Sequence, residues 1–408
     1  MKKKLIIINS LFYDNLIFEK YKFDKYLDNE LVEVEFWSLS FIDQEELKKN
    51  NIELFNAKNK EENELIQSRL NINFKKIYKF NEFILNLKQL KKNTFIFDLT
   101  LASTRNPIYC FLYKFFGAKL VYHGLTTEVS LVNFNFKDLF FLLKKNIYEW
   151  PLLIKKGFIF MFKNIYKKLL KPKIDIFFYN GTNEKDFAKK ISKKIVSLHA
   201  SDYEKYYEEE KIKNRFISQK FVLFLDMGYP KPEDINFTSE RPATNEYDYK
   251  KGMINLFNYI IKLFPDQKIV VALHPKSKKE NFYGYESYKN LTPKLTKECS
   301  FVLSHNSISL QYAALWNKPS FLIYNNDMIK KFNTSKEIEW FINEYKLPKI
   351  NIDNLNAENL KNLILDQKKK FDNGNEYYKD FIKRFIKDEP ENEKRIPKTI
   401  IETISNFY

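Results

Sequence analysis

Residues 268–276 read KIVVALHPK, an apolar run that ends in a histidine, a proline and a lysine. A short, β-branched apolar run that stops at a proline predicts a buried β-strand over 268–273. Residues 221–226 (FVLFLD) and 300–305 (SFVLSH) repeat the pattern, because each is an apolar run that ends in a polar residue. A helix is expected over 248–264, between the first two of these strands in chain order. Strands that alternate with helices are typical of a parallel α/β sheet.

The same alternation runs through both halves of the chain. Further helices are expected over 81–91, 107–116 and 309–316, and further strands over 3–9, 32–37, 94–98, 119–122, 174–179, 195–198 and 320–324. The fold class is therefore α/β, with two Rossmann-like domains that face each other across a cleft. A length of 408 residues, which is long for one ordinary core, agrees with two domains.

The domain boundaries follow from residues 202–215, a charged stretch that we interpret as a helical connector between the domains. We place the N-terminal domain at 1–205 and the C-terminal domain at 206–385. A C-terminal helix at 386–408 is expected to pack back on the N-terminal domain.

The ends of the chain and its cysteines indicate a cellular compartment. The start, MKKKLIIINS, is basic, but its apolar run is short for a signal peptide and no small-residue cleavage site follows it. The sequence has no run of about 18 apolar residues, so no membrane span is predicted. The two cysteines, Cys110 and Cys299, lie far apart in apolar surroundings, so no disulfide framework is expected. These features favour a cytoplasmic protein.

The formal net charge of +17 indicates an anionic partner: a nucleic acid, a phosphorylated donor or an anionic lipid surface. The composition offers a second explanation, because lysine, asparagine, isoleucine and phenylalanine are abundant while glycine and alanine are scarce. A chain encoded by an AT-rich genome has this bias. The position of the charge is therefore more informative than its sum.

Three polar residues, Asp226, His274 and His305, stand directly after predicted strands. Ligands bind at the carboxyl edge of open parallel sheets, so these side chains are expected to line one crevice. His274 is followed by Pro275 and Lys276 and can present a proton, while the lysines supply positive charge. A phosphate leaving group needs this environment. The alternative is that His274 only ends a strand and the lysines are solvated.

A second motif, Ser304 to Ser309 (SHNSIS), precedes the apolar helix. Ser307 or Ser309 is expected to cap that helix, whose free N–H groups and hydroxyls form a phosphate cradle. His305 supports the same loop, and Asn306 lies within it. Ordinary capping is the alternative, but the nearby His274 motif favours a binding role.

These residues carry a resemblance to a known family. The run 221–324 resembles the C-terminal domain of bacterial GT-B glycosyltransferases from capsule and lipooligosaccharide clusters. Its His-Pro and serine motifs are similar to those with which bacterial sialyltransferases and polysialyltransferases hold the phosphate of a CMP-sugar. Polyglycerolphosphate-type transferases also have a His-Pro element, a serine-rich element and a later Lys-Pro, here Lys318-Pro319. The resemblance implies that His274 is catalytic and that the donor is bound by Asp226, Pro275, Lys276, His305, Asn306, Ser307 and Ser309.

The resemblance also implies a function. It indicates an inverting glycosyltransferase that moves a sugar, a nonulosonic acid such as sialic acid from a CMP donor, onto a surface-polysaccharide or lipooligosaccharide acceptor. The alternative is a CDP-polyol phosphotransferase-like enzyme of capsule or teichoic-type polymer synthesis. The partners are then a nucleotide sugar and a glycan or glycolipid acceptor. No cofactor or metal is expected, because the histidines are scattered and no Asp-x-Asp motif is present.

The acceptor base is open, because the family's motif of two acids and a glycine is not present. An inverting transferase needs a carboxylate to deprotonate the acceptor hydroxyl. Asp98 ends one predicted strand, and Glu128 lies in a loop that follows another. His123 and Gly124, at the start of that loop, are further cleft candidates, and each of these residues can equally be a turn or packing residue.

Two other classes of protein compete with a transferase. A basic nucleic-acid-binding protein fits the charge and the 17% aromatic content, but no helix-turn-helix, zinc-finger or RNP-like pattern occurs, so no nucleic acid is expected as a partner. A sugar-nucleotide epimerase of similar build would form product without an acceptor.

Residues 139–170 interleave aromatic and apolar residues with lysines, and Glu149 is the one acid among them. The aromatic residues are too many for a solvated helix, and the lysines are too many for a buried one. An interfacial segment accommodates both, with rings at the headgroup boundary and lysines on anionic lipid. We therefore expect a peripheral enzyme on the inner face of the cytoplasmic membrane. Packing of the rings under the N-terminal domain is the alternative.

Binding to anionic vesicles tests the interfacial segment. We expect the wild type to co-sediment at low salt and less so at high salt, because each lysine near such a surface contributes about 1 kcal/mol. A variant with Lys155, Lys156, Lys163 and Lys167 changed to Glu is expected to stay in the supernatant. A wild type that stays in the supernatant, or a variant that pellets equally well, would place the segment in the core.

Overall fold

The protein is described by a computed structural model, which divides into two compact units. Unit 1 comprises Met1–Leu125, Asn133–Ser201 and Glu389–Tyr408, and unit 2 comprises Thr126–Val132 and Asp202–Asp388. The residues that the structure describes are 2–9, 21–27, 29–39, 74–99, 107–124, 173–230, 244–275, 277, 279–330, 332–372, 374–389 and 395–408. Glu128, Lys276 and the segment 139–170 lie outside these residues.

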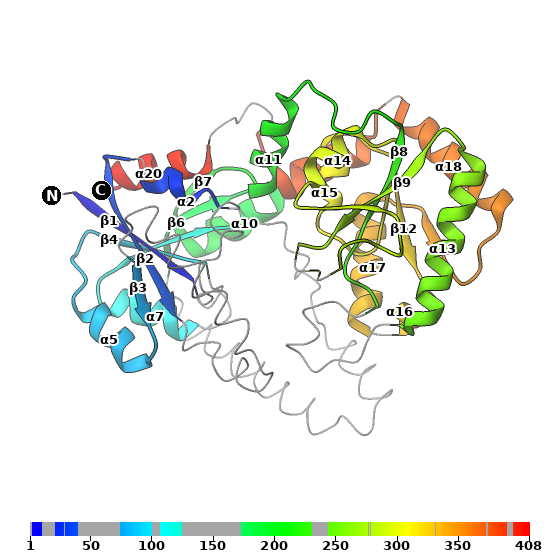
Figure 1. Cartoon of the computed structure of the whole chain (residues 1–408). Helices are drawn as coiled ribbons and strands as arrows, with labels where there is room; N and C mark the ends of the chain where they lie inside the picture. The colour runs from blue at the N-terminus through cyan, green and yellow to red at the C-terminus, as the bar shows by residue number, and fades with distance from the viewer. Residues whose placement is uncertain are drawn as a thin grey trace. The chain divides into compact units, whose positions relative to one another are not determined.

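Unit 1 is built on a seven-stranded sheet in the order β3-β2-β1-β4-β5-β6-β7 (Figure 1). All of its strand pairs are parallel. Its strands are β1 (Lys3–Asn9), β2 (Val32–Leu39), β3 (Phe74–Ile77), β4 (Thr94–Asp98), β5 (Lys119–His123), β6 (Ile174–Tyr179) and β7 (Ser192–Ser197). Its helices are α2 (Phe23–Leu27), α5 (Phe80–Lys88), α7 (Pro107–Phe115), α10 (Thr182–Ile191) and α20 (Ile396–Ser405).

The central strand β1 is buried on both faces. Its side chains alternate, so that Leu5 and Ile7 join one core cluster, while Ile6 and Ile8 join another. The first cluster contains α2 and α20, which lie side by side (Figure 1). The second contains residues of α5 and α7. A run of four apolar residues is thus explained by helices on both sides of a parallel strand.

Helix α20 is tied to the start of the chain. The Lys3 ammonium donates to the carbonyl oxygens of Ile404 (3.1 Å), Ser405 (2.7 Å) and Phe407 (2.6 Å). The last carbonyls of a helix lack partners within it, and a cation there also favours the helix dipole. Lys3 therefore fixes the C-terminal end of α20 against the edge of β1 at which the chain begins.

Unit 2 contains a six-stranded, parallel sheet in the order β10-β9-β8-β11-β12-β13. Its strands are β8 (Phe221–Leu225), β9 (Lys268–Leu273), β10 (Glu286–Lys289), β11 (Val302–Ser304), β12 (Ser320–Tyr324) and β13 (Lys349–Asn351). Numbered along the chain within the unit, this order is 3-2-1-4-5-6, the order of the Rossmann fold. The first six strands of unit 1 follow the same order.

Helix α13 (Glu246–Leu263) shows how the sequence sets the helices of unit 2. Asn245 caps it by accepting from the backbone N–H groups of Tyr247 (2.8 Å) and Asp248 (3.3 Å). Its buried residues are Tyr249, Gly252, Met253, Leu256, Phe257 and Ile260, which form one helical face. The other helical elements are α11 (Ser201–Glu210), α14 (Thr292–Glu298), α15 (Leu310–Leu315), α16 (Asn326–Lys330), α17 (Phe332–Tyr345), α18 (Ala357–Asp372), α19 (Glu376–Phe381) and a π-helical turn at Ile382–Ile386.

The predicted α/β class, with a parallel sheet in each half, is confirmed. Three strands were not predicted, namely β3 (FKKI), β10 (ESYK) and β13 (KIN). Each lies at the edge of its sheet, where short, charged strands do not show the apolar signal of a buried strand. In the described part of the chain, no helix is both long and apolar enough to cross a membrane.

Packing of α20 on the unit 1 sheet can be tested by Ile400→Ala. The Ile400 side chain is fully buried, so its truncation is expected to lower the free energy of unfolding by about 2–5 kcal/mol. Lys398→Ala, at an exposed position of the same helix, is the matched control and is expected to have a small effect. Urea denaturation monitors both variants, and equal effects would contradict the packing of α20.

Candidate functional site

The strand order of unit 2 reverses between β8 and β11, and such a switch point opens a crevice at the carboxyl ends of the strands. Leu225, at the end of β8, is in register with Ser304 of β11 and Ala272 of β9. The next residues in the chain therefore meet at one edge of the sheet. Those residues are Asp226 after β8, His274 after β9, His305 after β11 and Asn325 after β12.

Asp226 is buried at this edge with one oxygen engaged and one oxygen unused. Its Oδ1 accepts from the backbone N–H of Gly228 at 2.8 Å, and its buried Oδ2 has no hydrogen-bond partner among the described residues. Burial raises the pKa of Asp226, although the N–H of Gly228, the Lys279 ammonium and the backbone N–H of His274 oppose the shift. Oδ2 is therefore free to accept from a polar group of a ligand.

His305 is a fixed, neutral support beneath the site. Its Nδ1 lies 2.8 Å from the carbonyl oxygen of Ile323, which can only accept, so Nδ1 carries the proton. Its Nε2 lies 2.8 Å from the Tyr249 hydroxyl, which then donates to it. Burial lowers the pKa of His305 to about 4. Both ring nitrogens are thus used within the protein, and His305 holds β11, β12 and α13 together.

Asn306 orients the loop after β11. Its Oδ1 accepts from the Tyr229 hydroxyl at 3.0 Å, and its Nδ2 donates to Glu337 of α17. The Tyr229 ring packs edge-on against His305, with ring centroids 5.0 Å apart. Asn306 therefore connects the loop after β8 with α17, and its side chain serves the framework of the site.

The two serines of the motif have different surroundings. Ser307 is buried, and its Oγ accepts from the backbone N–H of Ser309 at 3.2 Å, which closes a tight turn. Ser309 is half-buried and forms no side-chain cap on α15, which has six residues. Of the two hydroxyls, that of Ser309 is the less committed.

The loop after β9 brings a cation to Asp226. His274 is half-buried and Pro275 is exposed. The Ser277 N–H donates to the carbonyl of His274 at 2.8 Å, which turns the chain back on itself. Lys279 then donates to the carbonyl of Tyr229 at 3.3 Å and contributes a favourable charge to the Asp226 carboxylate.

Tyr283 is a second buried polar group without a partner at this edge. Its hydroxyl makes no hydrogen bond to the residues that the structure describes, and burial raises its pKa to about 12, with Glu246 and Asp226 adding to the shift. The Lys279 ammonium lies 5.5 Å from its ring centroid. Tyr229, Tyr249 and Tyr283 were not found by sequence reasoning, because the chain has 26 tyrosines and none stands in a motif.

The remaining predicted residues lie in unit 1. Asp98 ends β4 and is buried, and it accepts from the Tyr113 hydroxyl at 3.0 Å. Gly124 follows β5, and its carbonyl accepts from the Asn180 amide. A Cβ at Gly124 would collide with the carboxylate of Glu184, the flexible end of a side chain, which would have to move.

His123, at the end of β5, is also buried and neutral. Its Nε2 lies 2.9 Å from the Asn180 Oδ1 and 3.1 Å from the His199 carbonyl, both acceptors, so Nε2 carries the proton. Its buried Nδ1 has no hydrogen-bond partner in the described part of the chain. Burial lowers the pKa of His123 to about 3, with the nearby His199 adding to the shift.

The structure thus sorts the predicted residues into two groups. Asp226, His274, Pro275, His305, Asn306, Ser307 and Ser309 gather at the carboxyl edge of the unit 2 sheet. Asp98, His123 and Gly124 lie at the carboxyl ends of β4 and β5 in unit 1. Among the residues described, no group of three or more His, Cys, Asp or Glu side chains is arranged to hold a metal ion.

Comparisons with known proteins bear on the fold. No protein-family model matches the sequence, and no curated protein matches it. The wall teichoic acid polymerase TagF (H548A form) has 11% identity over 98% of this chain and 88% of its own, with a TM-score of 0.50. MnaA of S. aureus with UDP has 14% identity over 99% and 96%, with a TM-score of 0.48. MurG of Acinetobacter baumannii has 8% identity over 98% and 99%, with a TM-score of 0.47. At these identities the similarity concerns the fold, which is the expected two-domain, GT-B-like α/β fold.

The two buried histidines predict a loss of stability in acid. An unfolded histidine binds a proton near pH 6.5, whereas His305 resists protonation down to about pH 4 and His123 down to about pH 3. Their contribution is complete above pH 6.5 and falls as the pH falls toward those values. At pH 5, unfolding is expected to take up about one proton for each of them.

The measurement is the free energy of unfolding between pH 7.5 and pH 5, for wild type, His305→Gln and His123→Gln. Each variant is expected to lose about one proton from the uptake, which is a shallower dependence on pH whatever its absolute stability. A variant with the pH dependence of the wild type would show that its histidine is already charged in the fold.

Proposed function

We propose that this protein is an inverting, metal-independent glycosyltransferase that binds a nucleotide-linked donor at the carboxyl edge of the unit 2 sheet. The observation that carries the proposal is the gathering of Asp226, His274 and the serine motif at a topological switch point, with Lys279 beside them. Ligands of open parallel sheets bind at such a point. The proposed donor is an activated sugar, and the proposed acceptor is a glycan or glycolipid.

His274 has the central chemical role in the proposed reaction. As the bond between the sugar and the donor phosphate breaks, negative charge grows on the phosphate oxygen. His274 is placed after β9 and half exposed, so it can donate a proton or hydrogen bond to that oxygen. Lys279 adds positive charge on the same loop, and Ser309 offers a hydroxyl from the loop after β11. Proline at 275 limits the backbone after His274 and so its freedom to turn away.

Buried polar groups without partners support donor binding at this edge. Asp226 Oδ2 and the Tyr283 hydroxyl have no hydrogen-bond partner within the described ranges. A buried polar atom without a partner costs about 1–3 kcal/mol, so each favours a ligand that supplies one. Hydroxyl or amino groups of a nucleotide sugar match Asp226, which only accepts when it is ionised.

The acceptor base is proposed to be a carboxylate, and Asp98 and Glu128 both remain candidates. Asp98 ends β4 next to β1, where the strand order of unit 1 reverses. Its bond from Tyr113 stabilises the ionised form but also holds the side chain. Glu128 lies outside the described residues.

The proposed donor is a CMP-linked nonulosonic acid such as sialic acid. The proposed site of action is the inner face of the cytoplasmic membrane, where segment 139–170 would bring the enzyme close to a lipid-linked acceptor. A second candidate is transfer of a polyol phosphate from a CDP-linked donor. The similarity of fold to TagF, a wall teichoic acid polymerase, is the reason to retain polyol phosphate transfer as a candidate. Both reactions release CMP, so both predict that CMP binds.

A thermal-shift screen separates the two candidates, since a ligand that binds the native state raises its apparent stability. CMP is expected to raise the melting temperature under either proposal. CMP-sialic acid then supports sugar transfer, and CDP-glycerol supports polyol phosphate transfer. If RNA stabilises the protein and no nucleotide sugar does, the protein is a nucleic-acid-binding protein and both transferase proposals fail. If product forms from a nucleotide sugar without any acceptor, the protein is an epimerase.

His274→Ala is expected to reduce turnover by about 10²–10⁴-fold, the usual contribution of a proton-transfer group, while CMP still binds. The matched control is Glu280→Gln, an exposed change in the same loop, which is expected to keep full activity. Turnover is measured as nucleotide release that depends on acceptor. Near-normal turnover of His274→Ala would remove His274 from the mechanism.

The same assay assigns the base. We expect only one of Asp98→Asn and Glu128→Gln to abolish transfer while nucleotide binding is kept. Loss of transfer in neither variant would mean that the base is not one of these carboxylates.

A further inference from the structure

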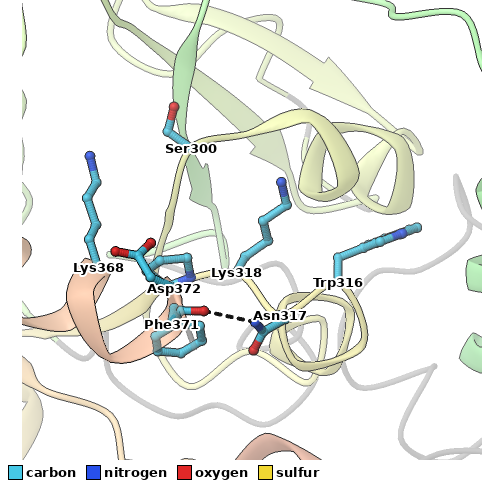
Figure 2. A pocket seen from close by; sticks show the side chains of 8 residues that line it. Ser300, Trp316, Asn317, Lys318, Lys368, Phe371 and Asp372 are labelled. Carbon is cyan, nitrogen blue, oxygen red and sulfur yellow. Dashed lines mark hydrogen bonds between the residues drawn. The ribbon is translucent and has the colours of Figure 1, made fainter. Parts of the chain in front are cut away.

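A pocket of about 320 Å³ lies at the opposite, amino-terminal edge of the unit 2 sheet (Figure 2). Ser300 precedes β11, and the segment from Trp316 to Pro319 precedes β12. The third wall is the end of α18, with Lys368, Phe371 and Asp372. Since β11 and β12 are parallel, this pocket is separated from the candidate site by the length of the strands.

Lys368 brings a partly buried cation to this pocket. It is half-buried, and its ammonium lies over the rings of Phe264 (4.4 Å) and Phe301 (5.1 Å). Burial lowers its pKa; the charge of Asp266 opposes this shift, and the charge of Lys220 adds to it. Within the described residues Lys368 forms no hydrogen bond or ion pair. A partly desolvated ammonium in this state favours an anion that can approach it.

Lys318 and Ser300 supply further donors. The Lys318 ammonium donates to the carbonyl of Cys299 at 2.9 Å, which orients it and leaves two N–H groups. The Ser300 hydroxyl makes no hydrogen bond to the described residues. Figure 2 shows the two lysine side chains running in the same direction, toward the side of the pocket where Ser300 lies.

Two groups of the lining could repel an anion, namely the carbonyl of Phe371 and the carboxylate of Asp372. The Asn317 amide donates to the carbonyl of Phe371 at 3.3 Å, at the C-terminal end of α18 (Figure 2). Asp372, the one acid of the lining, is exposed and forms no ion pair with the described residues. The pocket therefore has two ammonium groups and one hydroxyl against one solvated carboxylate.

We propose that this pocket binds the phosphate group of an organic phosphate ester. A phosphate has enough oxygens to accept from both ammonium groups and from the hydroxyl at once, which a carboxylate with two oxygens does less well. The rings of Trp316 and Phe371 give the organic part an apolar wall. A volume of about 320 Å³ is at the lower end for ligand pockets, which suits a small ester or a lipid headgroup. The site is independent of the proposed function, because it lies at the other edge of the sheet.

Calorimetric titration with glycerol phosphate tests the proposal. The wild type is expected to show saturable binding, and the double variant Lys318→Gln/Lys368→Gln is expected to bind at least about tenfold more weakly, since hydrogen bonds to charged groups are lost. Lys361→Gln/Lys370→Gln removes the same charge from exposed positions of α18 and is expected to bind like the wild type. His274→Ala is also expected to bind normally, which separates this pocket from the candidate site.

A conservative variant guards against a general loss of structure. Lys318→Arg/Lys368→Arg keeps both charges and is expected to keep binding within a few fold, as well as the melting temperature of the wild type. Equal weakening in the Arg and Gln variants would overturn the proposal. Equal binding by the wild type and the Gln variant would do so too.

Vesicles distinguish the two sources of phosphate. If soluble glycerol phosphate binds, the ligand is a free ester. If it does not, but the Gln variant pellets less than the Lys361→Gln/Lys370→Gln control with phosphatidylglycerol vesicles, the ligand is a lipid headgroup. If neither probe distinguishes the Gln variant from that control, the pocket has no phosphate site.

Discussion

The framework of unit 2 depends on one buried, neutral imidazole. His305 stands after β11, donates to the carbonyl of Ile323 in β12 and accepts from the hydroxyl of Tyr249 in α13. A buried polar group without partners would cost about 1–3 kcal/mol, so the arrangement requires that each of these elements keep its position. Phe224 and Tyr229 pack edge-on against the same ring, which sets the end of β8 and the loop after it. The carboxyl edge of the sheet is therefore organised around a residue that does not need to touch a ligand.

The apolar strands could be predicted from the sequence, and the edges could not. KIVVAL and FVLFL are buried on both faces, and this environment leaves an apolar run that can be read without a structure. ESYK and KIN pair on one side only and carry exposed polar side chains, so they look like loops. The order of the strands could not be deduced either. It depends on the side of β8 on which each later strand is added, and no local sequence signal encodes this.

The sequence was sufficient to predict that the candidate site lies at strand ends. It was not sufficient to predict which of its side chains bond within the protein and which remain available to a ligand. Proline after His274 and the serines after His305 mark where strands stop, which is local chemistry. Whether a side chain is committed depends on distant partners such as Tyr249 and Glu337. The family resemblance implied that His305, Asn306 and Ser307 bind the donor, and the structure shows hydrogen bonds within the protein for all three. Tyr283 stands in no motif, although its hydroxyl lacks a partner.

This division gives a physical criterion for locating a ligand on the unit 2 edge. Groups that position the backbone have their hydrogen bonds satisfied in the free protein, because an unsatisfied framework would not hold its geometry. Groups that bind a ligand must keep a hydrogen-bond donor or acceptor unused in the free protein. Asp226 meets both conditions, since Oδ1 is held by Gly228 while Oδ2 has no partner. The cost of burying Oδ2 alone is tolerable because the firmly bonded His305 framework stabilises the same edge. The uneven satisfaction of polar groups, rather than their number, therefore favours Asp226, Tyr283 and Lys279 over the loop of Asn306 as contacts of the proposed donor.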